Sequence, residues 1–297
     1  MNPRERGFLL LGSHLGDPER KPLTGPQLRV LADRVRELEM DDPNRDLKPS
    51  DLKALGYGSA LAEHVVALLE EEDRLDHYLS RAARMGCVPI TRVSGNYPLL
   101  LRKRLGLDSP AVLWAKGDIS LLDTAAVALV GSRELGEENR GFAADVGRQA
   151  AAQGFTLISG NARGADRTAQ DACLAAGGCV ISVVADELAK QPKTERVLYL
   201  SEDGFEEAFS AQRALSRNRV IHALGWRTFV AQTAAGMGGT WDGTVKNLRF
   251  GWSEVYCFDD GSEGAELLGR MGAFLIRRED LEDFGALPEK EMNLFDR

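Results

Sequence analysis

Apolar residues recur every three or four positions in the first third of the chain. This spacing places them on one face of a helix, and Thr24 is a suitable N-cap for it. The residues at this spacing are Leu28, Leu31, Val35 and Leu38. The segment 48–86 continues with a short helical pattern, a glycine-rich turn and longer helical patterns. We therefore expect residues 1–85 to form a small helical N-terminal domain that makes packing or partner contacts.

From residue 86 the pattern changes to short apolar runs that alternate with helical segments. The runs that read as strands are GCVPITR, AAVALV, FTLI, CVISVV, RTFVAQT and SEVYCF. Buried strands that alternate with helices indicate a parallel, doubly wound sheet. We expect an α/β fold, with an extended Rossmann-like domain over 86–276 whose core begins near residue 124. Residues 277–297 read as an acidic C-terminal tail.

Composition is consistent with this division into two domains. The chain has 297 residues and is 43% hydrophobic, which is ordinary for a folded globular protein. No apolar run approaches the roughly 20 residues of a membrane span, and the apolar stretch near the N-terminus is too short for a signal peptide. We therefore expect a cytoplasmic protein.

The four cysteines do not indicate a metal site. Their spacing contains no CxxC, and no histidine lies at metal-ligand spacing, so buried reduced thiols are the simpler interpretation. They are Cys87, Cys173, Cys179 and Cys257. We expect no metal and no cofactor.

Charge is distributed unevenly along the chain. The net charge is −8, which argues weakly against a nucleic-acid partner, but distribution matters more than the total. Residues 254–297 hold twelve acids and five bases, a net −7, whereas residues 210–250 hold six bases and one acid, a net +5. The basic segment makes an anionic ligand plausible.

Two of the expected strands end in glycine-rich turns that lead into helices. Ligands of open parallel sheets bind beyond the carboxyl ends of the strands, where glycine lets backbone amides approach an anion and arginine adds bidentate phosphate contacts. In the first turn, LVGSR, the candidates are Gly131, Ser132 and Arg133. In the second, ISGNARGAD, they are Ser159, Gly160, Arg163, Gly164 and Asp166. Any strand-to-helix turn favours glycine, so ordinary turns with solvated charges are the alternative interpretation.

Two later segments contain further candidates for the same site. Arg217, Asn218 and Arg219 precede an apolar stretch, where three polar donors at a helix start suit phosphate capture. The loop 234–244 adds Gly239 and Thr240 as amide and hydroxyl donors. A solvated helix end is the competing interpretation of the first group.

Catalysis has little support in the sequence. No Ser/His/Asp or Cys/His grouping stands out, and GxGxxG is absent. His222 lies in a helical pattern as a core or surface residue, and Asp166 fits a helix cap better than a catalyst. We therefore expect a binding protein and not an enzyme.

These motifs together resemble the DNA-processing protein A (Smf) family. GSR, SGxARGxD, SRNRVI and GGTxxxT occur in that order, after the lead-in NYPLLLRKRLGLDSPAVLWAKGD, and the resemblance covers about 88–276. It implies a cytoplasmic homodimer that binds single-stranded DNA in a basic pocket at the strand ends. It also implies loading of a strand-exchange recombinase during natural transformation, and so a role in DNA uptake or recombination.

The chain departs from the family pattern near the expected pocket. Gln170 stands where the family usually has His, Asp186 lies where Gly is usual after the third strand, and Gln232 replaces Glu. These differences bear on ligand identity more than on fold.

A different class of function remains open from the sequence. The same superfamily resembles lysine-decarboxylase-like phosphoribohydrolases, so a nucleotide-binding sensor or a nucleotide hydrolase is the alternative. Those enzymes carry PGGxGTxxE; here GGT has no Glu at that spacing, and Asp242 is the acid nearby. Separately, the sequence from Glu291 to Phe295, EMNLF, is similar to a sliding-clamp-binding pentapeptide.

Overall fold

The computed structural model describes residues 1–36 and 46–290. Within these residues, no helix combines the length and the apolar composition needed to cross a membrane. The α-helices are α1 (Pro3–Gly12), α2 (Gly25–Arg36), α3 (Pro49–Ala54), α4 (Ser59–Leu69), α5 (Glu72–Arg84), α6 (Leu99–Leu105), α7 (Glu137–Ala152), α8 (Ala165–Ala175), α9 (Ala211–Ser216), α10 (Asn218–Leu224), α11 (Gly238–Phe250) and α12 (Glu263–Arg270). The strands are β1 (Val88–Thr91), β2 (Val112–Gly117), β3 (Ala126–Val130), β4 (Thr156–Ser159), β5 (Val180–Val183), β6 (Val197–Ser201), β7 (Arg227–Val230), β8 (Glu254–Phe258) and β9 (Phe274–Ile276).

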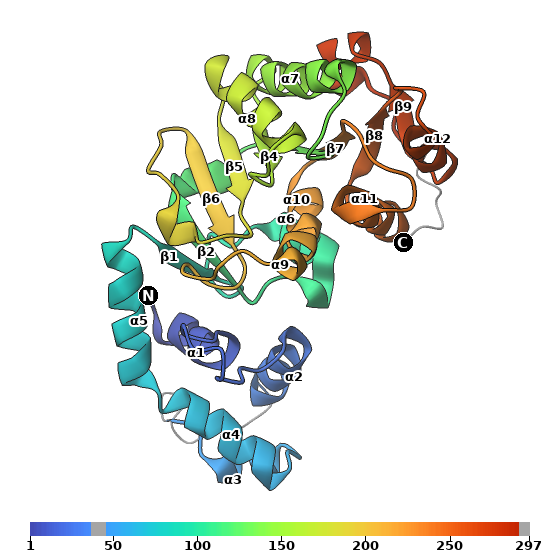
Figure 1. The fold of residues 1–297 in the computed structure, drawn as a ribbon. Coiled ribbons are helices and arrows are strands. Elements are labelled where there is room, and N and C mark those ends of the chain that lie inside the picture. Colours follow the sequence, from blue (N-terminus) through green and yellow to red (C-terminus); the bar gives the residue numbers. More distant parts are fainter. Residues whose placement is uncertain (37–45, 291–297) are drawn as a thin grey trace.

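One sheet contains all nine of these strands (Figure 1). Their order is β1-β2-β6-β5-β4-β3-β7-β8-β9. β1 and β2 run antiparallel to their neighbours, and every pairing from β6 to β9 is parallel. The predicted α/β fold with a doubly wound, mainly parallel sheet is confirmed. β2, β6 and β9 are strands that the apolar runs did not identify.

The sheet is covered on both faces, which explains its continuous apolar strands. One core contains side chains of α7 and α8, such as Phe142 and Cys173, against alternate residues of the strands. The other contains side chains of α6, α10, α11 and α12, such as Leu101 and Ile221. β3 illustrates the division, because Leu129 packs in the first core and Val130 in the second.

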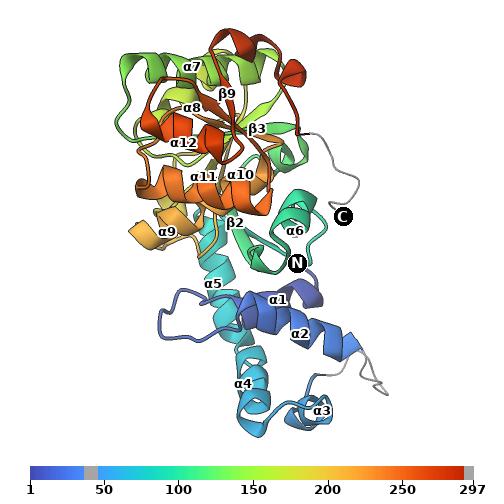
Figure 2. The ribbon, with the colours of Figure 1, turned by 90° about the vertical axis from the view of Figure 1, so that its right-hand side faces the viewer.

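The N-terminal helices gather at one end of the molecule, and α5 joins them to the sheet (Figure 2). Side chains of α2, α3 and α4 form a separate apolar core that includes Leu28, Leu31 and Leu52. α1 and α5 instead share the core of the sheet, where Tyr78 packs against Trp114 and Phe205. This region is helical as expected, and its division from the rest at residue 85 stays a prediction.

The described part of the segment expected to be a tail packs on the sheet. Leu281, Phe284 and Leu287 are buried in the first core. Arg227 of β7 is fully buried and donates to the carbonyl of Phe284 and to Glu289. Residues 277–290 therefore extend the folded body, because apolar side chains alternate with the acids. The clamp-like pentapeptide lies outside the described residues.

Replacing Phe284 with alanine tests this packing. Phe284 is 0% exposed and its ring contacts Phe155 and Phe229, so the substitution should lower the free energy of unfolding by about 3–5 kcal/mol. Phe209→Ala, at a ring that is 56% exposed, should change it by less than about 0.5 kcal/mol. Denaturant unfolding measures both, and equal small effects would contradict a packed C-terminal segment.

Candidate nucleic-acid interface

The predicted turns lie side by side at the carboxyl edge of the sheet. β3 pairs with β4 on one side and with β7 on the other, so the loops that follow these strands emerge next to one another. The chain winds from β3 toward β6 in one direction and from β7 toward β9 in the other. The junction of β3 and β7 is therefore the topological switch point, where open α/β sheets bind ligands. We call the loops after β3, β4 and β7, with the start of α10, the strand-end site.

Backbone contact fixes the first two turns against each other. Gly164 has φ +84°, and a Cβ there would collide with the carbonyl oxygens of Ser132 and Arg133. The amide of Ala165 donates to the Ser132 carbonyl over 3.1 Å. Glycine is thus required by both its dihedral angle and its surroundings. The result is that the GSR turn and the ARG turn form one continuous surface.

Arg217 closes the floor of this surface. Its side chain is buried against Gly160, where a Cβ would overlap the guanidinium group. It forms an ion pair of 3.7 Å with Asp166, and its Nη1 donates to Asn218. Its Nε is buried without a partner in the described structure. Arg217 therefore joins the start of α10 to the turn after β4.

Asp166 differs from the expected helix cap. The N-cap of α8 is Gly164, and Asp166 lies in the first turn with a buried carboxylate that accepts the amide of Ala162 over 3.1 Å. Burial raises the pKa of Asp166, and Arg217 acts in the opposite direction. The residue closes the loop and pairs with Arg217, because a buried carboxylate needs such partners.

Two predicted arginines remain on the open surface of the site. Arg163 is 76% exposed and lies 3.4 Å from Glu134, which is 88% exposed. Arg133 is also exposed, and its guanidinium lies 5.9 Å from the centre of the exposed Phe209 ring. Surface ion pairs of this kind are weak, so a phosphate can replace Glu134. The two arginines and Phe209 offer charge and an aromatic face together.

The predicted serines have other partners. Ser159 is fully buried, and its hydroxyl accepts from the Gln170 amide over 2.6 Å, so it lies beneath the site and not on its surface. Ser132 accepts from the backbone amide of Glu134 over 3.2 Å. Their hydroxyls therefore support the turns.

The start of α11 completes the site. Asn218 donates to the carbonyl of Gly239 over 2.9 Å, which joins the starts of α10 and α11. Thr240 is half-buried in the first turn of α11. Gly239 thus lies beside Asn218, and Thr240 follows it in the first turn of α11.

Arg219 lies apart from the other predicted residues. It pairs with the buried Glu202 over 2.6 Å and donates to the carbonyl of Asp108. Residues two apart on a helix point in opposite directions, so Arg217 and Arg219 cannot serve one phosphate together. Burial raises the pKa of Glu202 to about 7, and Arg219 opposes this rise.

Two of the departures from the family pattern have structural roles. Gln170 of α8 donates to Ser159 of β4 and, over 3.2 Å, to Ser182 of β5. Gln232 accepts the amide of Gly136 over 3.1 Å and, through its backbone carbonyl, the amide of Ser132. These side chains hold strands and loops in place from below the surface.

The sequence analysis did not identify Phe209 as a site residue. Its signal is a single aromatic residue in the polar stretch EEAFSAQR.

His222 is a buried neutral residue. It is 0% exposed, and burial, with a smaller effect of Arg217, lowers its pKa to about 3. Its Nδ1 lies 3.1 Å from Nδ2 of Asn247.

Among the described residues, no three His, Cys, Asp or Glu side chains form a group that could hold a metal ion.

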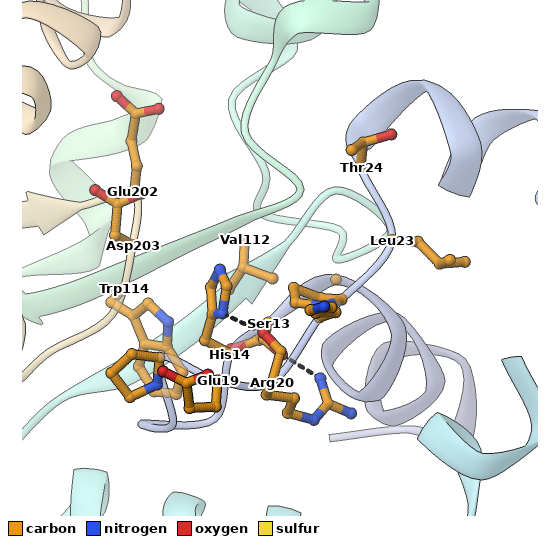
Figure 3. A pocket seen from close by; sticks show the side chains of 14 residues that line it. Ser13, His14, Glu19, Arg20, Leu23, Thr24, Val112, Trp114, Glu202 and Asp203 are labelled. Atoms are coloured by element: carbon orange, nitrogen blue, oxygen red, sulfur yellow. Dashed lines mark hydrogen bonds between the residues drawn. The ribbon is translucent and has the colours of Figure 1, made fainter. Parts of the chain in front are cut away.

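A separate cleft lies between the N-terminal helices and the antiparallel strands. It has a volume of about 490 Å³. Glu202 and Asp203 line one side, Leu23 and Thr24 the other, with His14 and Trp114 nearby (Figure 3). Three acids and two bases line it, together with His14, so its charge does not favour a phosphate. It contains none of the predicted site residues.

Fold and site together define a Rossmann-like protein with an arginine-bearing surface at the switch point. The family model of DNA recombination-mediator protein A matches residues 89–281. The chain therefore belongs to this family. The predicted family membership is confirmed.

Individual relatives agree with this assignment. A Mycobacterium tuberculosis protein is 33% identical over 139 residues, which is 43% of this chain and 36% of that protein. The DNA processing protein DprA of Bacillus subtilis is 28% identical over 171 residues, 54% of this chain and 57% of that protein. The chain thus aligns with between a third and three fifths of the length of these relatives.

Two solved structures share the fold. DNA processing protein A from Streptococcus pneumoniae has a TM-score of 0.74 at 22% identity and covers 95% of this chain and 98% of its own. DNA processing protein A from Helicobacter pylori has a TM-score of 0.55 at 21% identity. The match covers 66% of this chain and 94% of the Helicobacter pylori chain. At these identities, the likeness establishes the architecture alone.

The pKa of His222 predicts how stability changes with pH. The folded state keeps His222 neutral down to about pH 3, whereas the unfolded chain binds a proton near pH 6.5. Stability is therefore complete above pH 6.5 and falls as the pH drops toward 3, by up to about 1.4 kcal/mol per pH unit. Denaturant unfolding of wild type and His222→Gln should show a difference that changes with pH in this range. A constant difference would contradict a buried neutral His222.

Proposed function

We propose that the chain binds single-stranded DNA at the strand-end site and acts in DNA processing. The observation that carries this is the pair of exposed arginines, Arg133 and Arg163, on two turns locked together beside an exposed Phe209. Phosphates bind guanidinium groups and bases stack on aromatic rings. The H. pylori family member is described as having a single-stranded DNA binding mode, which supports the same ligand class here.

The remaining site residues contribute support in this proposal. Arg217 and Asn218 hold the floor. The glycines of the site leave room for close packing between its loops and helices; they are Gly131, Gly160, Gly164 and Gly239. Arg219 acts outside the strand-end site, for the geometric reason given above.

The finer role follows from family membership. We propose that the protein works in the cytoplasm as a homodimer during DNA uptake or recombination, and that it delivers single strands to a recombinase. A sliding clamp is a further proposed partner through residues 291–295. The proposal is for binding without catalysis. Asp166 is in a buried ion pair, and Asp242 pairs with Lys246 in an exposed contact, so neither of these two acids is well placed to serve a nucleotide hydrolase.

Oligonucleotide binding in a salt series tests the site. Affinity for oligo-dT should fall with salt, and Arg163→Ala should weaken binding and reduce the slope of log K against log salt by about 0.7, the single-strand value for one phosphate. Arg270→Ala is the matched control, because Arg270 is 74% exposed on α12 and also pairs with one glutamate. Fluorescence anisotropy measures each constant.

Two outcomes would overturn the proposal. One is a flat titration by the wild type at low salt. The other is an Arg163→Ala variant that matches Arg270→Ala in affinity and slope. A mononucleotide that raises the melting temperature while oligo-dT does not would favour the nucleotide sensor, because a ligand selective for the folded state stabilises it.

A further inference from the structure

A second hollow lies along α11, away from the strand-end site. It has a volume of about 470 Å³, and its walls come from the N-terminal helices and the α/β body. Gly25 and Pro26 at the start of α2 line it together with Leu107, Lys246 and Phe250. We call this hollow the α11 groove.

An aromatic and cationic stack forms one end of the α11 groove. The Phe250 ring is 60% exposed and stacks on Trp252, with centroids 5.6 Å apart and an interplanar angle of 16°. The guanidinium of the exposed Arg249 lies 5.3 Å from the centre of the Phe250 ring. Arg249 makes no ion pair within the described residues. The ring face and the guanidinium are therefore both accessible to a ligand, and base stacking on aromatic rings and phosphate contacts with arginine use these groups.

The segments that supply the cations of the α11 groove are basic although the chain as a whole is acidic. Residues 92–117 hold five bases and one acid, a net +4, and residues 210–250 have a net +5. These two segments are in contact, since Arg104 of α6 donates to the carbonyls of Ala223 and Gly225. Lys246 pairs with Asp242 in an exposed i,i+4 contact, which is weak enough for a phosphate to displace.

The α11 groove is continuous with the strand-end site through α10 and α11. α11 begins with Gly238–Thr240 in the strand-end site and ends with Phe250 in the groove, a length of about 18 Å at 1.5 Å per residue. On α10, Arg217 faces the strand-end site and Arg219 lines the groove. A strand held at one site can therefore reach the other along a single helix.

We propose that the α11 groove binds the continuation of a single strand of DNA that is held at the strand-end site. This inference rests on the proposed function and extends it to a second contact. Phe250 stacks on a base, and Arg249 and Lys246 contact phosphates. Charged grooves lined by aromatic rings are typical of single-strand binding without sequence preference.

Oligonucleotide length separates the two contacts. We would measure oligo-dT binding by anisotropy from the shortest length that the wild type binds to one long enough to span both sites. Phe250→Ala should weaken the long oligonucleotide about five-fold or more and leave the shortest unchanged, whereas Arg163→Ala should weaken both. Phe250→Trp should retain the wild-type affinity. Met271→Ala, at a side chain 46% exposed beyond α12, is the control, and melting temperatures check folding.

Each other outcome overturns the inference. If Phe250→Ala binds the long oligonucleotide as the wild type does, while Arg163→Ala is impaired, the groove is not a DNA contact and the proposed function stands. If Phe250→Ala lowers the affinity by the same factor for oligonucleotides of every length, a second contact that only long oligonucleotides reach is excluded. A wild type that binds no oligonucleotide would overturn the proposed function as well. Equal weakening by Phe250→Trp and Phe250→Ala would exclude stacking.

Photo-cross-linking tests the groove in the wild-type protein, without a variant that could fail to fold. Long oligonucleotides with 5-iodouracil at successive positions would be irradiated in the complex, and the protein digested with trypsin. An adduct is expected on the peptide that begins at Phe250, after cleavage at Arg249. Adducts on the strand-end loops with none on residues 246–252 would overturn the inference.

Discussion

The buried ion pair between Arg217 and Asp166 is the interaction on which the site depends. It connects the start of α10 with the start of α8 across the end of β4, and Gly160 leaves the space in which the guanidinium lies. Burying both charges is expensive, and removing one partner would leave the other uncompensated. The pair therefore fixes the geometry of the two arginine-bearing turns rather than simply adding stability.

This arrangement divides the arginines by burial. Arg217 is 8% exposed and has protein partners, whereas Arg163 is exposed and is held by one solvated glutamate. A buried arginine that pairs with a buried carboxylate has a structural role. An exposed arginine with a weak partner is available to bind a ligand. The same contrast separates Arg219, which Glu202 holds, from Arg249, which lies beside the Phe250 ring of the α11 groove and forms no ion pair within the described residues.

Much of the fold could be predicted because a buried parallel sheet requires continuous apolar strands. The runs of β3 and β4 are fully buried and were identified from hydrophobicity. β6 was not identified, because its apolar run directly follows the charged segment KTER. The sequence predicted that the turns bearing these glycines and arginines belong to one site, and the structure shows that β3 and β4, which they follow, pair in the sheet. The opposite directions of Arg217 and Arg219, and the bonds of Gln170 to two strands, depend on helix phase and tertiary contact, which spacing alone does not reveal.

The central claim is that the loops of the strand-end site hold a single strand of DNA. Hydrogen–deuterium exchange of the full chain, with and without saturating oligo-dT, tests it most directly because it reports every peptide without a substitution. We expect slower exchange in residues 131–136, 160–164 and 237–240 when the oligonucleotide is bound. Unchanged exchange in all three loops, with protection elsewhere in the chain, would contradict the account.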